Sequence, residues 1–532
     1  MSSEASFRVL ISDSVSPKGV ELLQSTPGIE ATVKTGMSPG DLAAELGEYD
    51  GLIVRSATKV TADVLARPGR LKVIGRAGTG VDNIDLKAAT AAGVVVINTP
   101  GGNSIAAAEH TCSLLLALAR NVAQANRELR EGRWERKKYM GVEVAGKTLG
   151  VVGLGRIGRE VARRAQGFRM EVLGYDPYVS SDVAADCGVK TVELDELVSR
   201  SDFVTLHLPV SPDTKHLIDA KLLERFKSGA RLINCARGGL VDEAALYDAI
   251  ESGHLAGAAL DVFESEPPEN RRLVEHPNVV ATPHLGASTR EAQERVGTEI
   301  AAKVRDYLQD GVILDAVNFP SIGREEYATL GPVMDLAASL GSFVGQIAEG
   351  GFRGLQVRTF GIFSDHSLRP LAMAAAKGLL TPVISGGVSY VNSLALASER
   401  GIKVEESRSN ESSPYSGLLR LTLETDQGPV SVAGTLFEGD LARMVEVDGV
   451  AIESNPNGHL LFLRNRDVPG VVGRLGTLLG GADVNIAGIH LGRTKSRGDA
   501  VSIIRLDSQV PQDALAKIRE LEDIVFVRDV TV

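Results

Sequence analysis

Three segments of the chain carry polar side chains that could act together in acid–base chemistry. They read Asn-Cys-Ala-Arg-Gly-Gly from Asn234, Asp-Val-Phe-Glu-Ser-Glu-Pro-Pro from Asp261, and Thr-Pro-His-Leu-Gly-Ala-Ser from Thr282. Histidine titrates near neutral pH, and a carboxylate bonded to its second ring nitrogen would fix its tautomer and favour its protonated form. The planar guanidinium of arginine suits bidentate binding of a carboxylate. Together such groups could take a proton from a 2-hydroxy acid and hold its carboxylate beside a hydride-accepting nicotinamide.

Each of these segments follows an apolar run that is typical of a buried strand. The runs are Arg231–Cys235, Gly257–Val262 and Asn278–Thr282, with helical stretches between them. Ligands of α/β sheets bind beyond the carboxyl ends of the strands, which is where the three segments would meet. A single histidine is more often structural, and a single arginine is usually a surface charge. Three such groups at one edge of a sheet indicate a catalytic site.

A dinucleotide-binding fingerprint lies earlier in the chain. The apolar run Lys147–Val152 predicts a buried parallel strand, and a helix is expected over Arg159–Phe168. Between them stands Gly-Leu-Gly-Arg-Ile-Gly, with glycines at Gly153, Gly155 and Gly158. In order, these would permit a tight turn, allow the backbone to approach a pyrophosphate, and allow close packing of helix on strand. The N-terminus of the helix would attract the phosphates.

An acidic residue completes this unit. The next predicted strand, Glu171–Tyr175, ends in Asp176, where a carboxylate can accept hydrogen bonds from both ribose hydroxyls. A glycine-rich turn in some other α/β unit is the alternative, but it leaves the position of Asp176 unexplained. The combination predicts that this part of the chain binds a dinucleotide.

The residues before this unit predict a second parallel α/β layer. Its strands are expected at Phe7–Ser12, Gly51–Arg55, Leu71–Gly75 and Val94–Asn98. Arg55 ends one strand, and the run Arg-Ala-Gly-Thr-Gly-Val-Asp-Asn from Arg76 follows another. Backbone N–H groups of such a glycine-rich turn could hold a carboxylate. A turn that needs glycine only for its backbone conformation is the alternative.

A long helix is expected to connect the two layers. It spans Ala106–Arg130, with Glu109 and His110 near its start. The basic segment Trp134–Lys138 follows it. Charge runs of this kind are usually solvated surface.

The remainder of the chain predicts two more units. For residues 321–451 helices are expected at Leu330–Ile347 and Leu368–Leu380, strands at Leu418–Glu424 and Val430–Leu436, and an exposed serine-rich loop at Glu405–Ser416. After His459 the pattern is strand, helix, strand, strand, helix, strand, at Leu460–Leu463, Val471–Leu479, Val484–Leu491, Ala500–Leu506, Gln512–Leu521 and Val525–Val530. This βαββαβ order predicts a ferredoxin-like domain.

Composition limits the classes of protein that fit. A chain of 532 residues is too long for one core, so roughly three or four domains are expected. The net charge of −11 argues against nucleic acid or an anionic membrane as the main partner, but allows a phosphorylated substrate in a local basic pocket. Three widely spaced cysteines, no apolar run long enough for a bilayer and no signal peptide favour a cytoplasmic protein without a metal site.

Four motifs together resemble the D-2-hydroxyacid dehydrogenase family over roughly residues 7–320. They are Arg-Ala-Gly-Thr-Gly-Val-Asp-Asn from Arg76, Gly-Leu-Gly-Arg-Ile-Gly from Gly153, Ala-Arg-Gly-Gly-Leu-Val-Asp-Glu from Ala236 and Pro-His-Leu-Gly-Ala-Ser-Thr from Pro283. By position, the resemblance implies that Arg237 binds substrate, that Glu266 orients the histidine, and that His284 is the acid/base. Glu266 argues against the formate dehydrogenase branch, which lacks such a glutamate. The cofactor is expected to be NAD, bound by the fingerprint and by further residues, namely Thr79, Arg156, Ile157, Asp176, Cys235, Arg237, Asp261 and His284. The substrate domain of the family is discontinuous, so a helix over Ser288–Leu308 should return to the N-terminal layer.

The C-terminal units narrow the resemblance to the long, ACT-containing branch of phosphoglycerate dehydrogenases. The resemblance implies oxidation of 3-phosphoglycerate to 3-phosphohydroxypyruvate with NAD, the first committed step of serine synthesis. It also implies a homotetramer. The implied substrate-binding residues are Arg55, Gly80, Val81 and Asn103, with Arg136 reaching the substrate of a neighbouring subunit. The implied architecture is two Rossmann-like doubly wound α/β domains, an intervening α+β domain and a C-terminal ferredoxin-like ACT domain. The expected boundaries are 1–100 with 288–320 for the substrate domain, 101–287 for the NAD domain, 321–452 for the intervening domain and 453–532 for the ACT domain.

The ACT resemblance implies L-serine as an allosteric effector bound between ACT domains of neighbouring subunits. The matching positions are Asn465, Asp467 and Asn485, although one form of the pattern has asparagine where Asp467 stands. A module kept only for tetramer contacts is the alternative. For the whole chain, the alternatives are a glyoxylate or hydroxypyruvate reductase and a nucleotide-sensing corepressor. Arg55 and the C-terminal units argue against a reductase, which needs neither.

Overall fold

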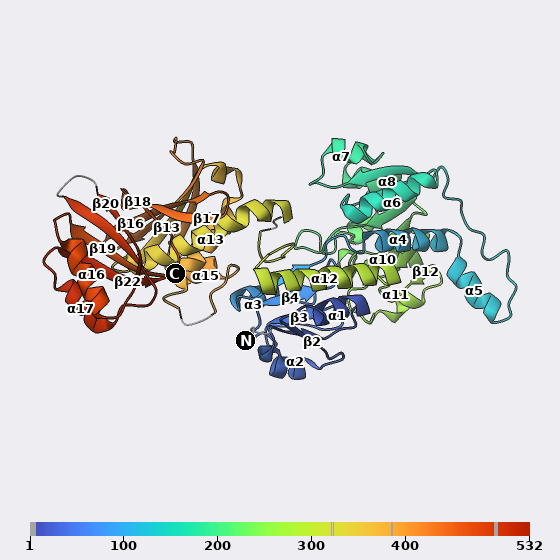
Figure 1. Cartoon of the computed structure of the whole chain (residues 1–532). Coiled ribbons are helices and arrows are strands. Elements are labelled where there is room, and N and C mark those ends of the chain that lie inside the picture. The colour runs from blue at the N-terminus through green and yellow to red at the C-terminus, as the bar shows by residue number, and fades with distance from the viewer. Residues whose placement is uncertain (1–6, 321, 323, 385–386, 494–497) are drawn as a thin grey trace.

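The structure is a computed structural model that describes residues 7–320, 322, 324–384, 387–493 and 498–532. Its described strands form four sheets, two in the half that carries the predicted catalytic residues and two in the C-terminal half (Figure 1). No helix among the described residues combines the length and apolar character required to cross a bilayer.

The N-terminal sheet has five parallel strands in the order β2-β1-β3-β4-β5, which is a doubly wound order. Its strands are β1 Phe7–Ile11, β2 Ile29–Val33, β3 Gly51–Val54, β4 Val73–Arg76 and β5 Val95–Asn98. Its helices are α1 Pro17–Gln24, α2 Pro39–Glu45 and α3 Leu86–Ala91.

Helix α12 (Arg290–Asp310) returns to this sheet from much later in the chain, which confirms the predicted return of Ser288–Leu308. Glycines allow α12 to pack closely on β4 and on α1, because a larger side chain at these contacts would overlap the neighbouring element. A Cβ at Gly75 would lie 2.7 Å from the side chain of Val304, and a Cβ at Gly19 would lie 2.5 Å from the carbonyl oxygen of Gly297. The N-terminal domain is therefore built from two separate stretches of the chain, the sheet from the first and α12 from the second.

The second sheet is also parallel, with seven strands in the order β12-β11-β10-β9-β6-β7-β8. This is the Rossmann order, extended by β12, so both α/β layers have the predicted fold class. Its strands are β6 Thr148–Val152, β7 Glu171–Tyr175, β8 Lys190–Thr191, β9 Phe203–Leu206, β10 Arg231–Asn234, β11 Gly257–Leu260 and β12 Val279–Ala281. The helices within it are α6 Arg156–Gly167, α7 Ser181–Ala185, α8 Leu194–Arg200, α9 Ala220–Leu223, α10 Glu243–Glu251 and α11 Arg271–Glu275.

The single helix predicted over Ala106–Arg130 is wrong. The structure has two helices there, α4 (Ser104–Ala119) and α5 (Val122–Arg130). Asn121 between them adopts a left-handed backbone conformation with φ of 53°, which asparagine tolerates better than most residues and which ends a right-handed helix. Helix α5 and the segment after it extend away from the two sheets (Figure 1).

The segment after α12 pairs with the edge of the N-terminal sheet before it enters the C-terminal half. Val317 N–H donates to Val96 O at 2.7 Å, and Ile97 and Ala316 form an antiparallel bridge. The side chain of Asn318 adds bonds to Val96 N and to Val94 O. The connection between the halves is thus bonded along β5.

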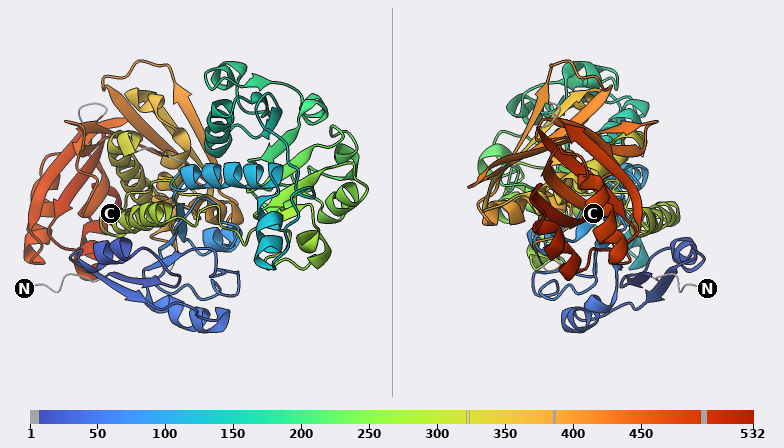
Figure 2. Two further views of the ribbon diagram at one scale, coloured as in Figure 1. Left: turned by 90° about the vertical axis from the view of Figure 1, so that its right-hand side faces the viewer. Right: turned by 60° about the vertical axis from the view of Figure 1, so that its left-hand side comes forward.

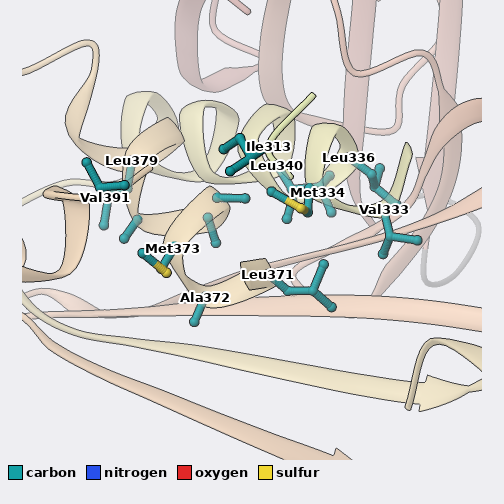
Figure 3. Close-up of a cluster of buried hydrophobic side chains, with 14 of the residues drawn as sticks. Ile313, Val333, Met334, Leu336, Leu340, Leu371, Ala372, Met373, Leu379 and Val391 are labelled. Atoms are coloured by element: carbon teal, nitrogen blue, oxygen red, sulfur yellow. The ribbon is translucent and has the colours of Figure 1, made fainter. Parts of the chain in front are cut away.

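The intervening domain has six strands in the order β14-β13-β15-β16-β17-β18, covered by two long helices. The strands are β13 Phe352–Gly361, β14 Lys403–Ser409, β15 Gly417–Thr425, β16 Gly428–Phe437, β17 Leu441–Val447 and β18 Val450–Ser454, and the helices are α13 Arg324–Ile347, α14 Leu368–Leu380 and α15 Ser393–Glu399. Helices α13 and α14 touch at Gly378, where a Cβ would lie 1.9 Å from Ala338 O. Figure 3 shows the apolar side chains, among them Leu340, Leu371 and Leu379, that fill the space around these helices.

The predicted loop Glu405–Ser416 is wrong in its first part. Strand β14 (Lys403–Ser409) pairs in parallel with β13 and occupies one edge of the sheet. Its polar sequence reflects the exposure of an edge strand and not the absence of regular structure, because most of its residues face solvent.

The C-terminal domain has the predicted βαββαβ order and a four-stranded sheet in the order β20-β21-β19-β22. Its elements are β19 His459–Arg466, α16 Val471–Gly481, β20 Ile486–Arg493, β21 Asp499–Leu506, α17 Gln512–Arg519 and β22 Ile524–Thr531. Phe462 packs edge-on against Phe343 of α13, with 5.7 Å between the ring centroids. Gln346 of α13 donates through Nε2 to Thr531 O at 2.9 Å. The chain end therefore lies against α13 (Figure 2, left).

Candidate active site

His284 and Glu266 meet at the carboxyl edge of the second sheet. The loops that carry them follow the neighbouring strands β12 and β11, and His284 Nδ1 lies 2.8 Å from Glu266 Oε2. His284 has a left-handed backbone with φ of 55°, and its N–H contacts the carbonyl oxygens of Asp261 and Thr282. Both side chains remain partly open to solvent, so a substrate could reach the second ring nitrogen.

The pair shifts the acidity of both partners in the direction that acid–base catalysis needs. The hydrogen bond to Glu266 raises the pKa of His284, and burial opposes the shift. Burial alone would raise the pKa of Glu266, but the bond and the charge of His284 outweigh it and lower that pKa. Glu266 is therefore ionised when His284 takes up a proton, which stabilises the imidazolium.

Arg237 contacts the substrate domain across the space between the two sheets. Its Nε donates to Asp82 Oδ2 at 2.8 Å, and its Nη1 donates to Ala236 O at 2.7 Å. Its Nη2 lies against Gly80, where a Cβ would come within 1.8 Å of it. Asp82 received no role from the sequence, although it stands in the quoted glycine-rich run.

Two further arginines lie on the substrate-domain side of the site, where Arg76 is close to both Arg237 and Arg55. Arg55 follows β3, and its Nη1 donates to Ser14 O at 3.1 Å. Arg76 ends β4; burial, and then the nearby positive charge of Arg237, lower its pKa to about 10. Within the described part of the chain, the buried Nε of Arg76 has no hydrogen-bond partner. Such a group is suited to an anionic ligand, because a ligand can satisfy a donor that the protein leaves unpaired.

Sequence reasoning missed Arg76. The signal was its position at a strand end, as the first residue of the glycine-rich run, where the carboxyl edges of α/β sheets bind ligands. The same run supplies Thr79, Gly80 and Val81. Thr79 Oγ1 donates to Asn103 Oδ1 at 2.8 Å, and Asn98 donates to Thr79 O at 2.6 Å. These bonds order the turn on which the predicted substrate residues lie.

The glycine-rich turn before α6 fits a pyrophosphate. Gly153 has φ of 97°, and a Cβ at Gly158 would lie 2.0 Å from Gly153 O. Gly155 is the N-cap of α6, has no side-chain cap, and would place a Cβ in open space. The helix N–H groups at this end are thus open to a phosphate, with Arg156 and Ile157 in the first turn of the helix.

Asp176 lies beside this turn. Its Oδ2 accepts a hydrogen bond from Leu154 N at 2.8 Å, and its Oδ1 accepts one from Tyr178 N at 2.9 Å. The carboxylate therefore orders the glycine-rich turn in addition to any bond it makes to a ribose. The arrangement fits NAD, which would supply a hydride acceptor when bound.

Cys235 and Asp261 are predicted to contact the cofactor, and each directly follows a strand, Cys235 after β10 and Asp261 after β11. Burial raises the pKa of the Cys235 thiol to about 12, so this cysteine is neutral and is not a nucleophile. Asp261 is fully buried and accepts bonds from Leu285 N at 2.7 Å and from Gly286 N at 2.8 Å. In this structure its visible function is to hold the loop that carries His284.

Arg136 is exposed and lies in the segment after α5, which extends from the body of the protein (Figure 1). The same segment exposes Trp134 and Met140 by 75% and 84%. Large apolar side chains so exposed on a projecting segment are typical of a contact surface.

The predicted regulatory residues lie at two ends of the ACT sheet. Asn465 is buried and accepts a bond from Ser502 at 2.9 Å, and Asp467 accepts one from Arg493 at 3.1 Å. Asn485 precedes β20 at the opposite end of the sheet and donates to Asp507 at 2.6 Å. One chain therefore does not bring Asn485 to Asp467.

Comparison with known families agrees with this organisation. Residues 112–286 match the NAD binding domain of D-isomer specific 2-hydroxyacid dehydrogenases. Residues 329–448 match the D-3-phosphoglycerate dehydrogenase intervening domain, and residues 459–523 match the ACT domain. The fold and the family match therefore both indicate NAD as the cofactor.

Similar proteins extend over nearly the whole chain. A D-3-phosphoglycerate dehydrogenase of a Synechocystis strain is 44% identical over 518 residues, which cover 97% of this chain and 93% of the relative. One from Archaeoglobus fulgidus is 42% identical, with 98% and 99% covered. A crystal structure from Thermus thermophilus, at 36% identity and a TM-score of 0.54, covers 58% of this chain and 100% of its own. Identity at this level along the chain shows that it belongs to the D-3-phosphoglycerate dehydrogenase family of NAD-dependent oxidoreductases.

Proposed function

We propose that this protein oxidises 3-phosphoglycerate to 3-phosphohydroxypyruvate with NAD. The observation that carries the proposal is the bonded pair of His284 and Glu266 at one sheet edge, with Arg237 extending from the next strand end toward the substrate domain. This arrangement supplies a proton acceptor, its orienting partner and a carboxylate-binding group.

In the proposed reaction His284 Nε2 accepts the proton of the substrate hydroxyl. Glu266 holds Nδ1 and stabilises the imidazolium that forms. Arg237 binds the substrate carboxylate through Nη2, since its Nε and Nη1 already donate to Asp82 and Ala236. NAD, held by the glycine-rich turn and Asp176, would supply the acceptor for the hydride that leaves the carbon bearing this hydroxyl.

The phosphate group distinguishes this substrate from glyoxylate or hydroxypyruvate. We assign it to Arg55 and Arg76, because both lie at strand ends of the N-terminal sheet and Arg76 keeps an unpaired buried donor among the described residues. Gly80, Val81 and Asn103 would line the space between them, and Thr79 would face the cofactor.

Steady-state kinetics test the proposal directly. The protein should reduce NAD with 3-phosphoglycerate and show a far lower kcat/KM with D-glycerate, which lacks the phosphate. Arg76→Gln should lower kcat/KM for 3-phosphoglycerate and leave that for D-glycerate nearly unchanged. Equal kcat/KM for the two substrates in the unmodified protein would contradict the phosphate assignment.

We also propose that the protein acts in the cytoplasm, as a homotetramer, at the entry to serine synthesis, and that L-serine inhibits it by binding between ACT domains of two subunits. The separation of Asp467 and Asn485 within one chain supports a site that two chains share. The exposed segment with Trp134, Arg136 and Met140 supports contact between subunits, in which Arg136 would reach a neighbour's substrate.

Two measurements test the assembly. Light scattering should give the mass of four chains, and calorimetry should detect serine bound at millimolar concentration or below. Absence of serine binding would leave the ACT domain a structural module. We also propose that each subunit is divided into domains at the boundaries predicted from the sequence.

A further inference from the structure

The proposed mechanism does not use His110, but the side chain of His110 contacts residues that hold the loop carrying His284. His110 lies on α4, and its Nε2 is 3.1 Å from Asp261 Oδ1 and 3.1 Å from Thr282 Oγ1. The side chain is 19% exposed, whereas Asp261 is at most 1% exposed. A partly buried histidine therefore contacts the buried carboxylate of Asp261, the residue whose backbone carbonyl accepts a bond from His284 N.

The positions of the hydrogens follow from the chemistry of the three groups. Thr282 Oγ1 lies 2.6 Å from Asp261 Oδ1, and since the carboxylate can only accept, the hydroxyl hydrogen points to it. The pKa of Asp261 is lowered: burial opposes this, but the bonds from His110, Thr282, Leu285 and Gly286 outweigh it, so the group is ionised. Both neighbours of His110 Nε2 are then acceptors, and Nε2 must carry a hydrogen that it shares between them.

The same carboxylate anchors the loop that carries His284. Asp261 accepts from Leu285 N and Gly286 N, and Asp261 O accepts from His284 N. These bonds hold His284 in its left-handed conformation, which other residues seldom adopt without support. Loss of one donor to a buried carboxylate is costly and would loosen this anchor.

We propose that His110 is a positioning residue for the reaction. Its Nε2–H, donated to Asp261 and Thr282, fixes the loop that sets the place of His284 relative to the substrate. The proposal rests on the proposed function for its kinetic consequence, but the loop contacts themselves do not depend on it.

Three substitutions distinguish a positioning hydrogen bond from simple packing. The amide nitrogen of Gln can occupy the place of histidine Nε2, whereas that of Asn corresponds to Nδ1, and Leu fills the space without a donor. His110→Leu and His110→Asn should lower kcat for 3-phosphoglycerate by roughly 10- to 100-fold, the effect of a small misplacement of a reacting group. KM for the substrate should change little, since Arg237, Arg55 and Arg76 are untouched. His110→Gln should recover most of the rate.

Amide hydrogen exchange provides a second readout that needs no turnover. The N–H groups of Leu285 and Gly286 should exchange slowly in the unmodified protein and in His110→Gln, and faster in His110→Asn and His110→Leu. Slow exchange and normal kcat in all variants would overturn the proposal, as would a Gln variant that resembles Leu in both measurements. If the unmodified protein fails to oxidise 3-phosphoglycerate, the proposed function is wrong, while the exchange rates still decide the role of His110.

Discussion

His284 Nδ1 and Glu266 Oε2 are 2.8 Å apart, although the two residues belong to loops that leave different strands. The bond raises the pKa of His284 above its ordinary value. Oxidation requires the neutral imidazole as proton acceptor, so the rate should rise with pH through this raised pKa. Below it, the protonated histidine has no lone pair for the substrate proton.

Glu266→Gln should move the midpoint of the pH–rate profile for oxidation downward, because the neutral amide no longer favours the imidazolium. The measurement is kcat/KM for 3-phosphoglycerate across the pH range. Glu264→Gln is the matched control, since Glu264 lies in the same loop and bonds to Glu243 N and not to His284. It should leave the midpoint in place.

His284→Ala should lower kcat by roughly 10²–10⁴ while NAD still binds.

Two glycines of the fingerprint should respond in opposite ways to alanine. Gly155→Ala adds a methyl in open space, so thermal stability without NAD should hold, while NAD affinity should fall because the methyl enters the pyrophosphate position. Gly158→Ala places a methyl 2.0 Å from Gly153 O and should destabilise the fold by about 1–3 kcal/mol. Thermal melts and calorimetry separate the two effects. Equal stability of both variants would contradict the packing assigned to Gly158.

Gly80→Ala should raise KM for 3-phosphoglycerate. The added methyl would overlap Arg237 Nη2, and because a long side chain can move aside, the guanidinium shifts and the fold survives. We expect KM to rise by roughly tenfold or more, the usual effect of losing a hydrogen bond to a charged group, with NAD affinity nearly unchanged. Gly40→Ala is the control, since its methyl would only approach Ser38 Oγ at 3.8 Å. A normal KM in Gly80→Ala would show that Arg237 does not need this position.

Asp176→Ala should weaken NAD binding by about 1.5–3 kcal/mol, the usual range for a hydrogen bond to a charged group. Asp176→Asn should weaken it less, because the amide oxygen can still accept from Leu154 N or Tyr178 N. Calorimetric titration with NAD and NADP measures both effects. Comparable use of the two cofactors by the unmodified protein would remove the role of Asp176 in selectivity.

Asn485→Ala should weaken serine binding and relieve inhibition without loss of the catalytic site. A point substitution is a better test than deletion of residues 453–532, because Phe462 and β22 cover α13 and deletion would expose Phe343. Calorimetry with serine and the rate at saturating serine are the two measurements. The control is Asn457→Ala, a surface asparagine that bonds to Ser339 and lies before β19. Full inhibition in Asn485→Ala would exclude this residue from the effector site.

Much of the fold and of the site could be predicted because both depend on local patterns. Parallel strands have continuous apolar sequences, and their carboxyl ends must share an edge. The positions of His284, Glu266 and Arg237 after strands therefore predict that the three lie together. The pairing of Arg237 with Asp82 could not be predicted, since it depends on how two separate sheets face each other. The break at Asn121 could not be predicted either, because a single asparagine barely disturbs helical periodicity.

Other misses have the same physical origin. Strand β14 has a polar sequence because it has a neighbour on one side only, and a polar, serine-rich sequence by itself predicts a loop. His110 has no local pattern that reveals its partner, because Asp261 and Thr282 approach it from distant parts of the chain. Contacts between side chains far apart in sequence need the three-dimensional structure.

The pairing of Val317 and Asn318 with β5 has a practical consequence for fragments of this protein. A catalytic fragment ended at Asp310, after α12, would leave Val96 N, Val96 O and Asn98 N, which now bond to Asn318, Val317 and Asp315, unpaired on an apolar strand. Such a strand recruits strands of other molecules and promotes aggregation. A fragment ended after Phe319 keeps the strand covered and should stay monodisperse at concentrations at which the shorter one precipitates.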